Sequence, residues 1–337
     1  MHVRSQSPVL MRLALILVHY HTPELAAEAV AALQADLAGI EAEWLLVDNG
    51  SDAEGRALLE SLPVQRIDPG TNLGYAGGVN LGAARSTADA LVLMNPDVLV
   101  LPGCIPALLD RLQSGAAVAG PAFYWDRGRR MLLPPAEARG RREELLRSRS
   151  RWRVHARRHW EASAPLESHS LSGSLLAIRR DAWERVGPFD EGFRLFFEET
   201  DWLLRARRLG LRSEYVPGAE AVHLYNRSAV KEPRSQQWFE ESAYRFRRLH
   251  YGSGFTWLLE RRKERPAPEL PILKEVPVEA GSWVEVSPNP AGFPAATERV
   301  SAPGLWKLPE EIAGRLEGSW TVQVTDGKGR ELVRGRL

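Results

Sequence analysis

The chain has 337 residues and a mass of 37.6 kDa, a length that suits two domains or one large domain with an appendage. Hydrophobic residues make up 44% and charged residues 26% of the sequence, which excludes a wholly disordered, collagenous or coiled-coil chain. Because 44 Lys and Arg nearly balance 43 Asp and Glu, the net charge of +1 gives no general attraction to nucleic acid, and we expect no nucleic-acid partner.

The cysteine content and the start of the chain bear on where the protein works. Cys104 stands alone, which excludes an internal disulfide framework and a cysteine-based zinc site and favours a reducing, cytoplasmic setting. The apolar run 9–18 is interrupted by Arg12 and is too short for a membrane span of about 20 residues. It leads directly into a helix-start signal, which disfavours a signal peptide. We predict that residues 1–11 form an N-terminal extension.

Residues 12–120 alternate between strand and helix patterns. Residues 13–18 are uniformly apolar, as in a parallel strand covered on both faces. Thr22-Pro23-Glu24 then supplies a cap, a proline at the first helical position and an acid in the first turn, which start a helix. The pattern repeats with expected strands at 44–47, 64–67 and 90–94 and expected helices at 53–62 and 79–85. The alternation predicts an α/β fold with a doubly wound, mostly parallel sheet.

The alternation stops after residue 120. Residues 121–165 are predicted to be an Arg-rich insert, with twelve Arg against five acids between positions 126 and 161. Strand and helix patterns resume over 166–264, with expected strands at 174–178, 211–216 and 221–225 and an expected helix from about 200 to 210. The insert would then divide a first half, 12–120, from a second half, 166–264.

The last part of the chain differs in composition. Nine prolines between positions 265 and 309 suit a linker and loops, and residues 320–333 have the pattern of a β-hairpin. We predict a Pro-rich linker at 265–274 and a small β domain at 275–337. A unit of this size has a marginal core, so we expect it to dock on the rest of the chain or in a homodimer. Because it lies far in sequence from the alternating strands and helices, we expect that it does not touch a functional site formed by them.

Polar clusters follow four of the expected strands. They contain His19 and His21, residues 48–51, residues 72–80 and residues 95–97. Ligands of doubly wound sheets bind beyond the carboxyl ends of the strands, so these clusters predict a ligand site. A dinucleotide site requires G-x-G-x-x-G in the first strand–helix turn, where this chain has no glycine. A hydride-transfer enzyme is therefore disfavoured.

Four sequence blocks carry a resemblance to a known family. They are Val47-Asp48-Asn49-Gly50-Ser51, Asn72 to Gly82, Leu93-Met94-Asn95-Pro96-Asp97, and Ser172 to Arg205, which includes Gly187-Pro188-Phe189-Asp190-Glu191 and Phe197-Glu198-Glu199-Thr200-Asp201. In this order they resemble the nucleotide-sugar glycosyltransferases of family 2, with the GT-A fold, and particularly the rhamnosyltransferase-like bacterial members. The resemblance covers residues 12–255. It implies metal-dependent, inverting transfer of a rhamnose-like sugar or a hexose from a UDP- or dTDP-activated donor to a saccharide or lipid-diphosphate-linked acceptor, in bacterial cell-surface polysaccharide synthesis.

The resemblance implies that residues 12–120 are a nucleotide-binding half, which carries the donor site, and that residues 166–264 are an acceptor-binding and catalytic half. Asp48, directly after a buried strand, can accept hydrogen bonds from a uracil or thymine ring or from ribose, and a turn that ends the strand is the alternative. Gly77 and Gly78 can let the backbone approach the donor closely, or they serve a tight turn into a helix. The implied donor-binding residues are His21, Asp48, Asn49, Ser51, Asn72, Gly77, Gly78, Asn80 and Asn95.

Asp97 and His223 are the implied ligands of a divalent metal, Mg²⁺ or Mn²⁺, which neutralises a diphosphate leaving group. Asn95-Pro96-Asp97 stands where related enzymes carry Asp-x-Asp, although turn chemistry explains the same tripeptide from local sequence. His223 with Ser228 matches the H-x-x-x-x-S pattern of the family. Neutral imidazole is a competent metal ligand, whereas a lone histidine in a strand is usually structural.

An acidic helix start supplies the candidate general base. Inverting transfer needs a carboxylate that removes the proton of the acceptor hydroxyl. Glu198, Glu199 and Asp201 stand at this helix start, where acids also act as ordinary solvated caps. The family commonly has Glu-Asp-x-Asp where this chain has Glu-Glu-Thr-Asp, so the resemblance places Glu199 in the base position with one extra methylene.

Basic clusters leave the acceptor side open. The Arg-rich insert, residues 245–248 and residues 261–263 suit a diphosphate-linked acceptor or a peripheral contact with the anionic inner face of a membrane, or they form a solvated face. The alternative to an enzyme is a non-catalytic nucleotide-sugar or saccharide-binding protein, with some of the eleven Trp as stacking surfaces.

Overall fold

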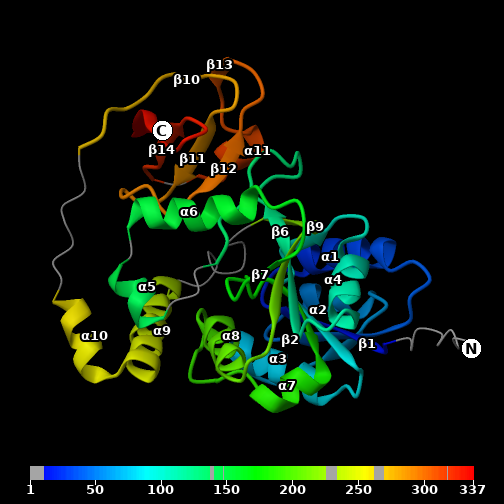
Figure 1. The fold of residues 1–337 in the computed structure, drawn as a ribbon. Coiled ribbons are helices and arrows are strands. Elements are labelled where there is room, and N and C mark those ends of the chain that lie inside the picture. The colour runs from blue at the N-terminus through cyan, green and yellow to red at the C-terminus, as the bar shows by residue number, and fades with distance from the viewer. Residues whose placement is uncertain (1–10, 137–139, 147, 225–233, 262–268, 317) are drawn as a thin grey trace, which may run out of the picture.

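The computed structural model describes residues 11–136, 140–146, 148–224, 234–261, 269–316 and 318–337. Figure 1 shows a large central sheet with helices on both faces, and a group of smaller sheets set apart from it. The first ten residues of the expected extension, the first four of the expected linker, and Ser228 lie outside the described residues.

The central sheet has nine strands, and most of them run in one direction. Its order is β3-β2-β1-β4-β8-β6-β9-β5, with β7 paired to β9. The strands are β1 (Leu13–His19), β2 (Ala42–Asp48), β3 (Gln65–Ile67), β4 (Ala90–Met94), β5 (Val98–Val100), β6 (Val118–Tyr124), β7 (Leu166–Glu167), β8 (Leu175–Arg179) and β9 (Ser213–His223). Strands β1 to β4 are mutually parallel, β8 is antiparallel to both β4 and β6, and β9 is parallel to β6. The predicted α/β fold with a mostly parallel sheet is confirmed.

The two faces of the sheet each carry a hydrophobic core. Alternate residues of β1 point to opposite faces, so that Leu15 packs with α1 (Pro23–Asp36) and α4 (Cys104–Gln113), while Ile16 packs with the helices on the other face. The latter are α3 (Gly74–Ala84), α7 (Arg180–Val186) and α8 (Glu198–Arg208), and α2 (Ala53–Glu60) packs against α1. Burial on both faces explains the uniformly apolar sequence of β1.

Two features of the sheet differ from the prediction. The expected strands at 211–216 and 221–225 are one strand, β9, whose pairing with β6 shifts register between Pro121 and Ala122. Pro217 and Gly218 interrupt its apolar pattern, and these residue types mark irregular positions in strands. Strand β6 also runs across position 121, where the sequence pattern suggests that the insert begins.

The C-terminal residues form two antiparallel sheets. A four-stranded sheet has the order β12-β11-β14-β15, and a two-stranded sheet pairs β10 with β13. The strands are β10 (Val276–Val278), β11 (Trp283–Ser287), β12 (Ala296–Arg299), β13 (Gly304–Trp306), β14 (Thr321–Thr325) and β15 (Glu331–Arg336), and α11 (Glu310–Ala313) lies between β13 and β14. The predicted hairpin is confirmed as the antiparallel pair β14 and β15.

The helix α6 (Arg149–Trp160) of the Arg-rich insert lies across the C-terminal sheet (Figure 1). Trp160 stacks on Trp283 with ring centres 5.9 Å apart, and Trp152 packs on Phe293 at 6.1 Å. Between them, the buried Arg153 donates two hydrogen bonds of 2.7 and 2.8 Å to the fully buried carboxylate of Glu285. The expectation that the C-terminal unit docks on the rest of the chain is met by this contact.

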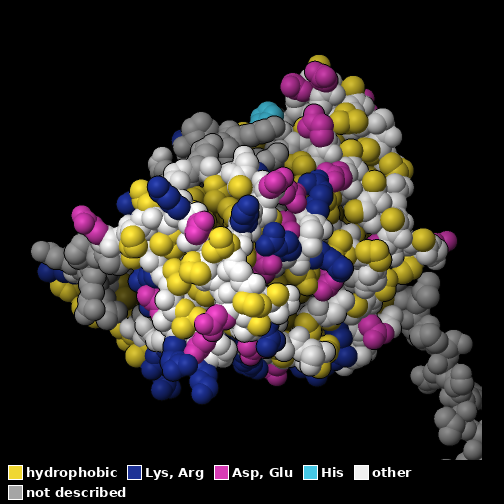
Figure 2. Space-filling model, turned by 90° about the horizontal axis from the view of Figure 1, so that it is seen from above, with side chains coloured by type: hydrophobic (Ala, Val, Ile, Leu, Met, Phe, Trp, Pro, Cys, Tyr) yellow, Lys and Arg dark blue, Asp and Glu magenta, His cyan; other side chains and the backbone are white. Residues whose placement is uncertain are grey.

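Other arginines of the insert also contact the C-terminal residues. Arg149 pairs with Glu331, Arg157 donates to Gly327 O and Thr325 Oγ1, Arg130 pairs with Glu298, and Arg127 pairs with Glu311. In Figure 2, basic and acidic side chains are interspersed across the middle of the face seen from above, with a group of basic side chains at the lower left. These arginines hold the C-terminal unit, and the side chains of Arg127 and Arg130 stay 49% and 43% exposed.

The remaining helices are α5 (Arg141–Leu145), α9 (Ser235–Tyr251) and α10 (Ser253–Glu260). They lie together at the lower left of Figure 1, beyond the edge of the central sheet. Within the described ranges, no helix is both long and apolar enough to cross a bilayer.

Candidate active site

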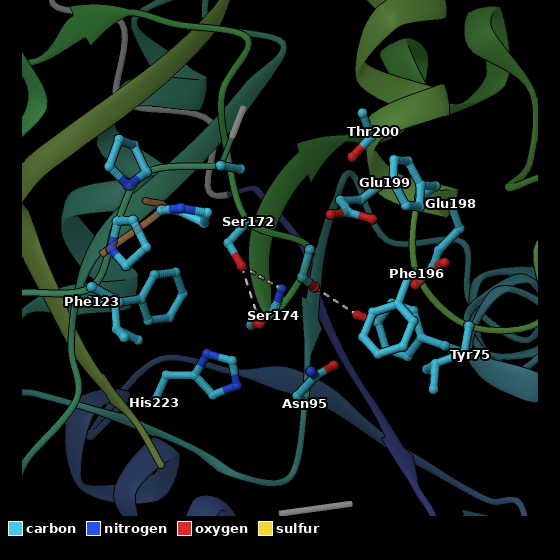
Figure 3. A pocket seen from close by; sticks show the side chains of 18 of the residues that line it. Tyr75, Asn95, Phe123, Ser172, Ser174, Phe196, Glu198, Glu199, Thr200 and His223 are labelled. Atoms are coloured by element: carbon cyan, nitrogen blue, oxygen red, sulfur yellow. Dashed lines mark hydrogen bonds between the residues drawn. The ribbon is translucent and has the colours of Figure 1, made fainter. Parts of the chain in front are cut away.

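A cavity of about 390 Å³ opens at the carboxyl edge of the central sheet (Figure 3). Its floor comes from Asn95 and Asp97 after β4 and from His223 at the end of β9. The loop 172–174 before β8 forms one wall, and the start of α8 with Glu198 and Glu199 forms another. The predicted catalytic and metal-binding motifs therefore meet in one cavity, although they are spread over more than a hundred residues of sequence.

A smaller cavity of about 100 Å³ adjoins the first. Tyr75, Asn95 and Leu195 line both cavities. The smaller one is also lined by Asn49, Asn72, Arg194 and Trp238. The pair of cavities thus offers an elongated site, with amide and cationic groups at one end and carboxylates at the other.

Three of the predicted donor residues line the smaller cavity, and their side chains shape it. Asn49 donates to Gly74 O at 2.9 Å and accepts from the Leu73 N–H at 3.3 Å, while Asn72 accepts from the Gly74 N–H. Asn95 donates its backbone N–H to Ser174 O at 2.9 Å. The asparagines therefore fix the loop that precedes α3 as well as facing the cavity.

Asp48 lies at the centre of a buried polar cluster behind this cavity. Its carboxylate accepts hydrogen bonds from Ser51 Oγ, the Gly50 N–H, His19 Nδ1 and Arg66 Nε. Burial raises the pKa of Asp48, but the hydrogen bonds from Ser51, Gly50 and His19 outweigh it and lower that pKa below its ordinary value. Asp48 is thus a carboxylate with its oxygens engaged by protein groups, and neither it nor Ser51 is among the lining residues of the two cavities.

The structure places the other predicted donor residues apart from the cavities. His21 is exposed, and the Asn80 side chain bonds to the backbone of Phe189 and to Glu191. A Cβ at Gly78 would meet Val18 at 2.6 Å, and one at Gly77 would meet Leu73 at 2.9 Å. These two glycines therefore permit close packing of α3 on β1 and on its own N-terminal turn, and they are buried.

Asp97 and His223 form the candidate metal pair. Both are buried at the cavity floor, with His223 Nε2 3.4 Å from Asp97 Oδ1. No group of three or more His, Cys, Asp or Glu suited to a metal occurs in the part of the chain that the structure describes. A hard divalent cation bound by one carboxylate commonly completes its shell with substrate phosphates and water. The donor set fits such a cation only with a bound diphosphate.

Glu198 and Glu199 form a coupled pair of carboxyl groups at the N-terminus of α8. Burial and the neighbouring charge of Glu199 raise the pKa of Glu198 well above its ordinary value of 4.5. Its Oε2 is buried without a hydrogen-bond partner among the described residues. Burial also raises the pKa of Glu199, but hydrogen bonds from its own N–H, Thr200 and the Gly173 backbone oppose the shift. Burial thus raises the pKa of both carboxyl groups, and the two differ in their contacts: Glu199 receives hydrogen bonds that favour its ionised form, whereas Glu198 keeps an unpartnered oxygen.

The loop 172–174 seats Glu199 tightly. A Cβ at Gly173 would lie 2.8 Å from Cγ of Glu199, so only glycine leaves space for that side chain. Tyr75 donates its hydroxyl proton to Gly173 O at 2.8 Å, as the dashed line in Figure 3 shows. Tyr75 thus connects the donor half to the wall that holds the carboxylate.

Asp201 lies one turn further along α8 and has protein partners. It accepts from Arg205 Nε at 2.8 Å and contacts His250 Nε2 at 2.7 Å. Despite burial, which raises it, the bonds from His250 and Arg205 lower the pKa of Asp201. It is not among the lining residues of either cavity, so its contacts fix α8 against α9.

Several cavity residues have no role in the sequence analysis, although all but Trp238 stand within the motif blocks. Phe196 and Phe197 have φ of +69° and +71°, a conformation in which bulky residues are rare and which tends to occur at functional sites. Arg194 and Trp238 line the smaller cavity, with the guanidinium 4.7 Å from the indole ring centre. Gly74, with φ of +73°, lies against the backbone of Arg194, where a Cβ would be 2.6 Å from its carbonyl oxygen.

One expectation about the C-terminal residues is wrong. Pro294, between β11 and β12, lines the larger cavity. It reaches the cavity because the C-terminal sheet docks on α6 and on the segment after β6, where Leu132 exchanges two backbone hydrogen bonds with Thr297. The C-terminal unit therefore contributes to the wall of the reaction centre.

The sequence model for glycosyl transferase family 2 matches residues 14–187, just over half of the chain. The chain belongs to glycosyl transferase family 2. The predicted family is confirmed, and Glu198, Glu199 and the candidate metal pair of this nucleotide-sugar glycosyltransferase lie in the cavity described above.

Three relatives illustrate the similarity. An N-acetylglucosaminyl-diphospho-decaprenol L-rhamnosyltransferase of Mycobacterium tuberculosis is 34% identical over 57% of this chain and 69% of its own length. The low-salt glycan biosynthesis hexosyltransferase Agl10 of Haloferax volcanii is 26% identical over 71% and 73% of the two chains. The dTDP-rhamnosyl transferase RfbF of Shigella flexneri is 24% identical over 56% and 61%.

The chain is also similar to solved structures of glycosyltransferases. The mannosyltransferase PcManGT from Pyrobaculum calidifontis, in complex with GDP-Man and Mn²⁺, aligns with a TM-score of 0.48 and 17% identity over 77% of this chain and 68% of its own.

Proposed function

We propose that this glycosyltransferase transfers a rhamnose-like sugar or a hexose from a UDP- or dTDP-activated donor, with inversion, to a saccharide or lipid-diphosphate-linked acceptor. The relatives named as a dTDP-rhamnosyl transferase and as a rhamnosyltransferase acting on a diphospho-decaprenol acceptor support this donor and acceptor chemistry. A role in assembling bacterial cell-surface polysaccharide at the cytoplasmic face of the membrane follows from such an acceptor.

The observation that carries the proposal is the pair of unequal carboxyl groups in the larger cavity. Glu199 is the general base, because Thr200 and the Gly173 backbone form hydrogen bonds with its carboxylate and so favour its ionised form. Glu198, buried with one oxygen unpartnered, stays protonated and neutral beside it. A second negative charge at this point would repel the diphosphate of the donor.

In the proposed transfer, the bond to the acceptor forms as the bond to the leaving group breaks. The acceptor O–H bond breaks as its proton moves to an oxygen of Glu199, and the acceptor oxygen forms a bond to C1 of the sugar. The bond from C1 to the diphosphate oxygen breaks, and the nucleoside diphosphate leaves with the electron pair. Because the acceptor attacks from the face opposite the leaving group, the configuration at C1 inverts.

We propose that Asp97 and His223 hold a divalent cation, Mg²⁺ or Mn²⁺, together with the donor diphosphate. Such a cation neutralises charge on the leaving group. Asp97→Ala is expected to abolish transfer and the metal-dependent part of donor binding, measured by calorimetric titration of donor with and without Mn²⁺. Metal-dependent donor binding that persists in Asp97→Ala would exclude this pair.

Arg194 and Trp238 are proposed to bind the donor at the smaller cavity. A guanidinium matches phosphate oxygens in a bidentate manner, and its position over the Trp238 ring holds it at the cavity wall. Asn49, Asn72 and Asn95 line the same space and offer amide donors and acceptors to ribose or base.

Substitution of each acid at the start of α8 tests the proposed function. Glu199→Gln keeps shape but removes the base, so turnover is expected to fall at least ~100-fold with little change in donor affinity. Glu198→Gln resembles the protonated carboxyl and is expected to keep most of the activity. Release of UDP or dTDP from candidate donors measures both. If Glu198→Gln or Asp201→Asn is the inactive variant and Glu199→Gln is active, the base assignment is wrong.

The same assay separates an enzyme from a binding protein. A non-catalytic nucleotide-sugar or saccharide-binding protein would bind the donor and release no nucleoside diphosphate with any acceptor. The raised pKa of Glu199 also predicts that activity falls as the pH drops through a value above 4.5, because the base is then protonated.

A further inference from the structure

The end of the molecule formed by α5, α9 and α10 exposes large apolar side chains. Leu145, Leu146, Leu249, Trp257 and Leu258 are each between 39% and 55% exposed. Figure 1 shows the three helices together, with α10 at the outer tip. Clusters of exposed apolar side chains of this kind mark surfaces that contact another molecule or a membrane.

These side chains project from a packed unit. Beneath them, the rings of Phe246, Tyr251 and Phe255 follow one another with centres 5.8 and 5.6 Å apart. The guanidinium of Arg141 on α5 donates to Tyr251 O and lies 5.9 Å from the Phe255 ring centre. The aromatic chain and this arginine join α5 to the turn between α9 and α10.

Basic side chains surround the apolar ones. Arg261 lies 4.0 Å from the ring centre of the exposed Trp257, and Arg248 lies 5.7 Å from that of Tyr244. Arg142 on α5 is exposed, as are Arg248 and Arg261, whereas Arg245 pairs with Asp190. Leu and Trp among Lys and Arg are the composition of helices that lie in the interface of an anionic bilayer.

The same helix connects this end to the active site. Phe239, near the start of α9, lines the larger cavity and packs edge-on against Phe196 at 5.5 Å. Twelve residues later α9 ends at Tyr251, beside the exposed Leu249. At 1.5 Å per residue this is a distance of about 18 Å. A lipid-linked acceptor could therefore lie along α9, with its lipid in the membrane near Leu249 and its diphosphate sugar in the cavity near Phe239.

We propose that the face formed by Leu145, Leu146, Leu249, Trp257 and Leu258, with Arg142, Arg248 and Arg261, docks on an anionic phospholipid surface. The inference rests on the proposed lipid-diphosphate-linked acceptor and names the face that brings the enzyme to it. The apolar side chains insert at the headgroup boundary, and the guanidinium groups pair with lipid phosphates. A second copy of the chain is the competing occupant, but like-charged arginines would then face one another across the contact.

Co-sedimentation of the full chain with vesicles tests this face. Vesicles of phosphatidylglycerol in phosphatidylcholine are expected to bind the protein, and pure phosphatidylcholine vesicles to bind it at least ~10-fold more weakly. Trp257→Glu with Leu258→Glu is expected to weaken binding to the anionic vesicles at least ~10-fold. Val154→Glu is the matched control, because Val154 is 73% exposed on α6, away from this face, and its variant is expected to bind as the native chain does.

Three results would overturn the proposal. The native chain could fail to bind anionic vesicles, Val154→Glu could weaken binding as much as the paired substitution, or the paired substitution could convert a dimer into a monomer in sedimentation velocity. Thermal unfolding checks that the variants remain folded. Transfer to a water-soluble acceptor is read separately, and the paired substitution is expected to leave it unchanged. If the native chain binds anionic vesicles but transfers no sugar, the proposed function fails while the docking face stands.

Discussion

Two helical regions of this chain both combine arginine with aromatic side chains, and their surroundings differ. On α6, the guanidinium groups of Arg149, Arg153 and Arg157 reach carboxylates, carbonyls and a hydroxyl of the C-terminal sheet. On α9 and α10, Arg248 and Arg261 lie over the rings of Tyr244 and Trp257, which are exposed. The first region is an internal contact, and the second faces solvent.

The difference lies in what folds against each helix. Residues 149, 153 and 157 recur at a spacing of four, so they share one face of α6 with the tryptophans that the C-terminal sheet covers. The partner carboxylate of Arg153 belongs to Glu285, which is 132 residues away in the sequence. Composition and periodicity are local properties and cannot identify a partner at that distance. Positive charge in a sequence thus predicts a polar surface without saying what covers it.

Removing the C-terminal sheet should have the largest effect on the first region. A chain that ends at Arg265 exposes Trp152 and Trp160 on α6 and Trp125 after β6, a large apolar area that favours aggregation. We expect little soluble monomer, measured by size-exclusion yield and thermal unfolding. Soluble monomer with the unfolding temperature of the full chain would show that α6 does not depend on the sheet. If the soluble fraction is folded yet no longer binds the nucleotide sugar, the donor site depends on the C-terminal residues.

Breaking the buried ion pair should have the next largest effect. Arg153→Met leaves the buried carboxylate of Glu285 unpaired and is expected to lower the free energy of unfolding by about 3–5 kcal/mol, measured by urea denaturation. Adding Glu285→Met is the control, since it removes the stranded charge and should restore most of the stability. A double variant as unstable as the single one would place the loss in packing.

Added salt should affect the two regions differently in the native chain: it should weaken vesicle binding and leave the stability of the fold nearly unchanged. Raising ionic strength screens exposed charges much more than buried ones. We expect binding to anionic vesicles through α10 to weaken steadily with added NaCl, while the urea midpoint of the full chain changes little. Salt-insensitive vesicle binding would mean that the apolar side chains alone carry the contact.

The smallest effect is expected on the outer face of α6. Arg151 and Arg158 are exposed, and substitution of either by Gln should change the free energy of unfolding by no more than about 0.5 kcal/mol. Vesicle binding should also stay unchanged, in contrast to Arg248→Gln and Arg261→Gln. Equal loss from all four variants would indicate general electrostatic attraction in place of a defined docking face.

The sequence predicts the strands that have a strong local signal. The uniformly apolar run of β1 and the five residues of β4 match the structure closely, because a strand buried on both faces must be apolar throughout. Strand β9 is predicted as two, because Pro217 and Gly218 look like a turn when seen alone. Pairing with β6 carries the strand through them, and pairing is a property of the whole sheet.

The residues of the candidate active site also differ in how far the sequence predicts them. Asp97, Glu199 and His223 are predictable because each stands in a family motif, and the structure brings them to one cavity. No role is predicted for Tyr75, although it stands within the block Asn72 to Gly82, or for Pro294, since both reach the cavity through packing between segments far apart in the sequence. The role of Gly78 is also missed, because a glycine that faces a donor and a glycine that packs a helix on a strand look identical in sequence.

Strand β8 has a mechanical consequence for how the enzyme accepts its substrates. It lies between β4 and β6 and is antiparallel to both. Just before its first residue, Ser174 O accepts a hydrogen bond from the Asn95 N–H. Asn95 after β4 and the loop 172–174 before β8 are therefore joined to one continuous hydrogen-bonded sheet. A hinge between the two halves would require those bonds to break. We therefore expect differences in acceptor size to be met by side chains that line the cavity outside the sheet, such as Phe196 and Phe239, and not by movement of the strands.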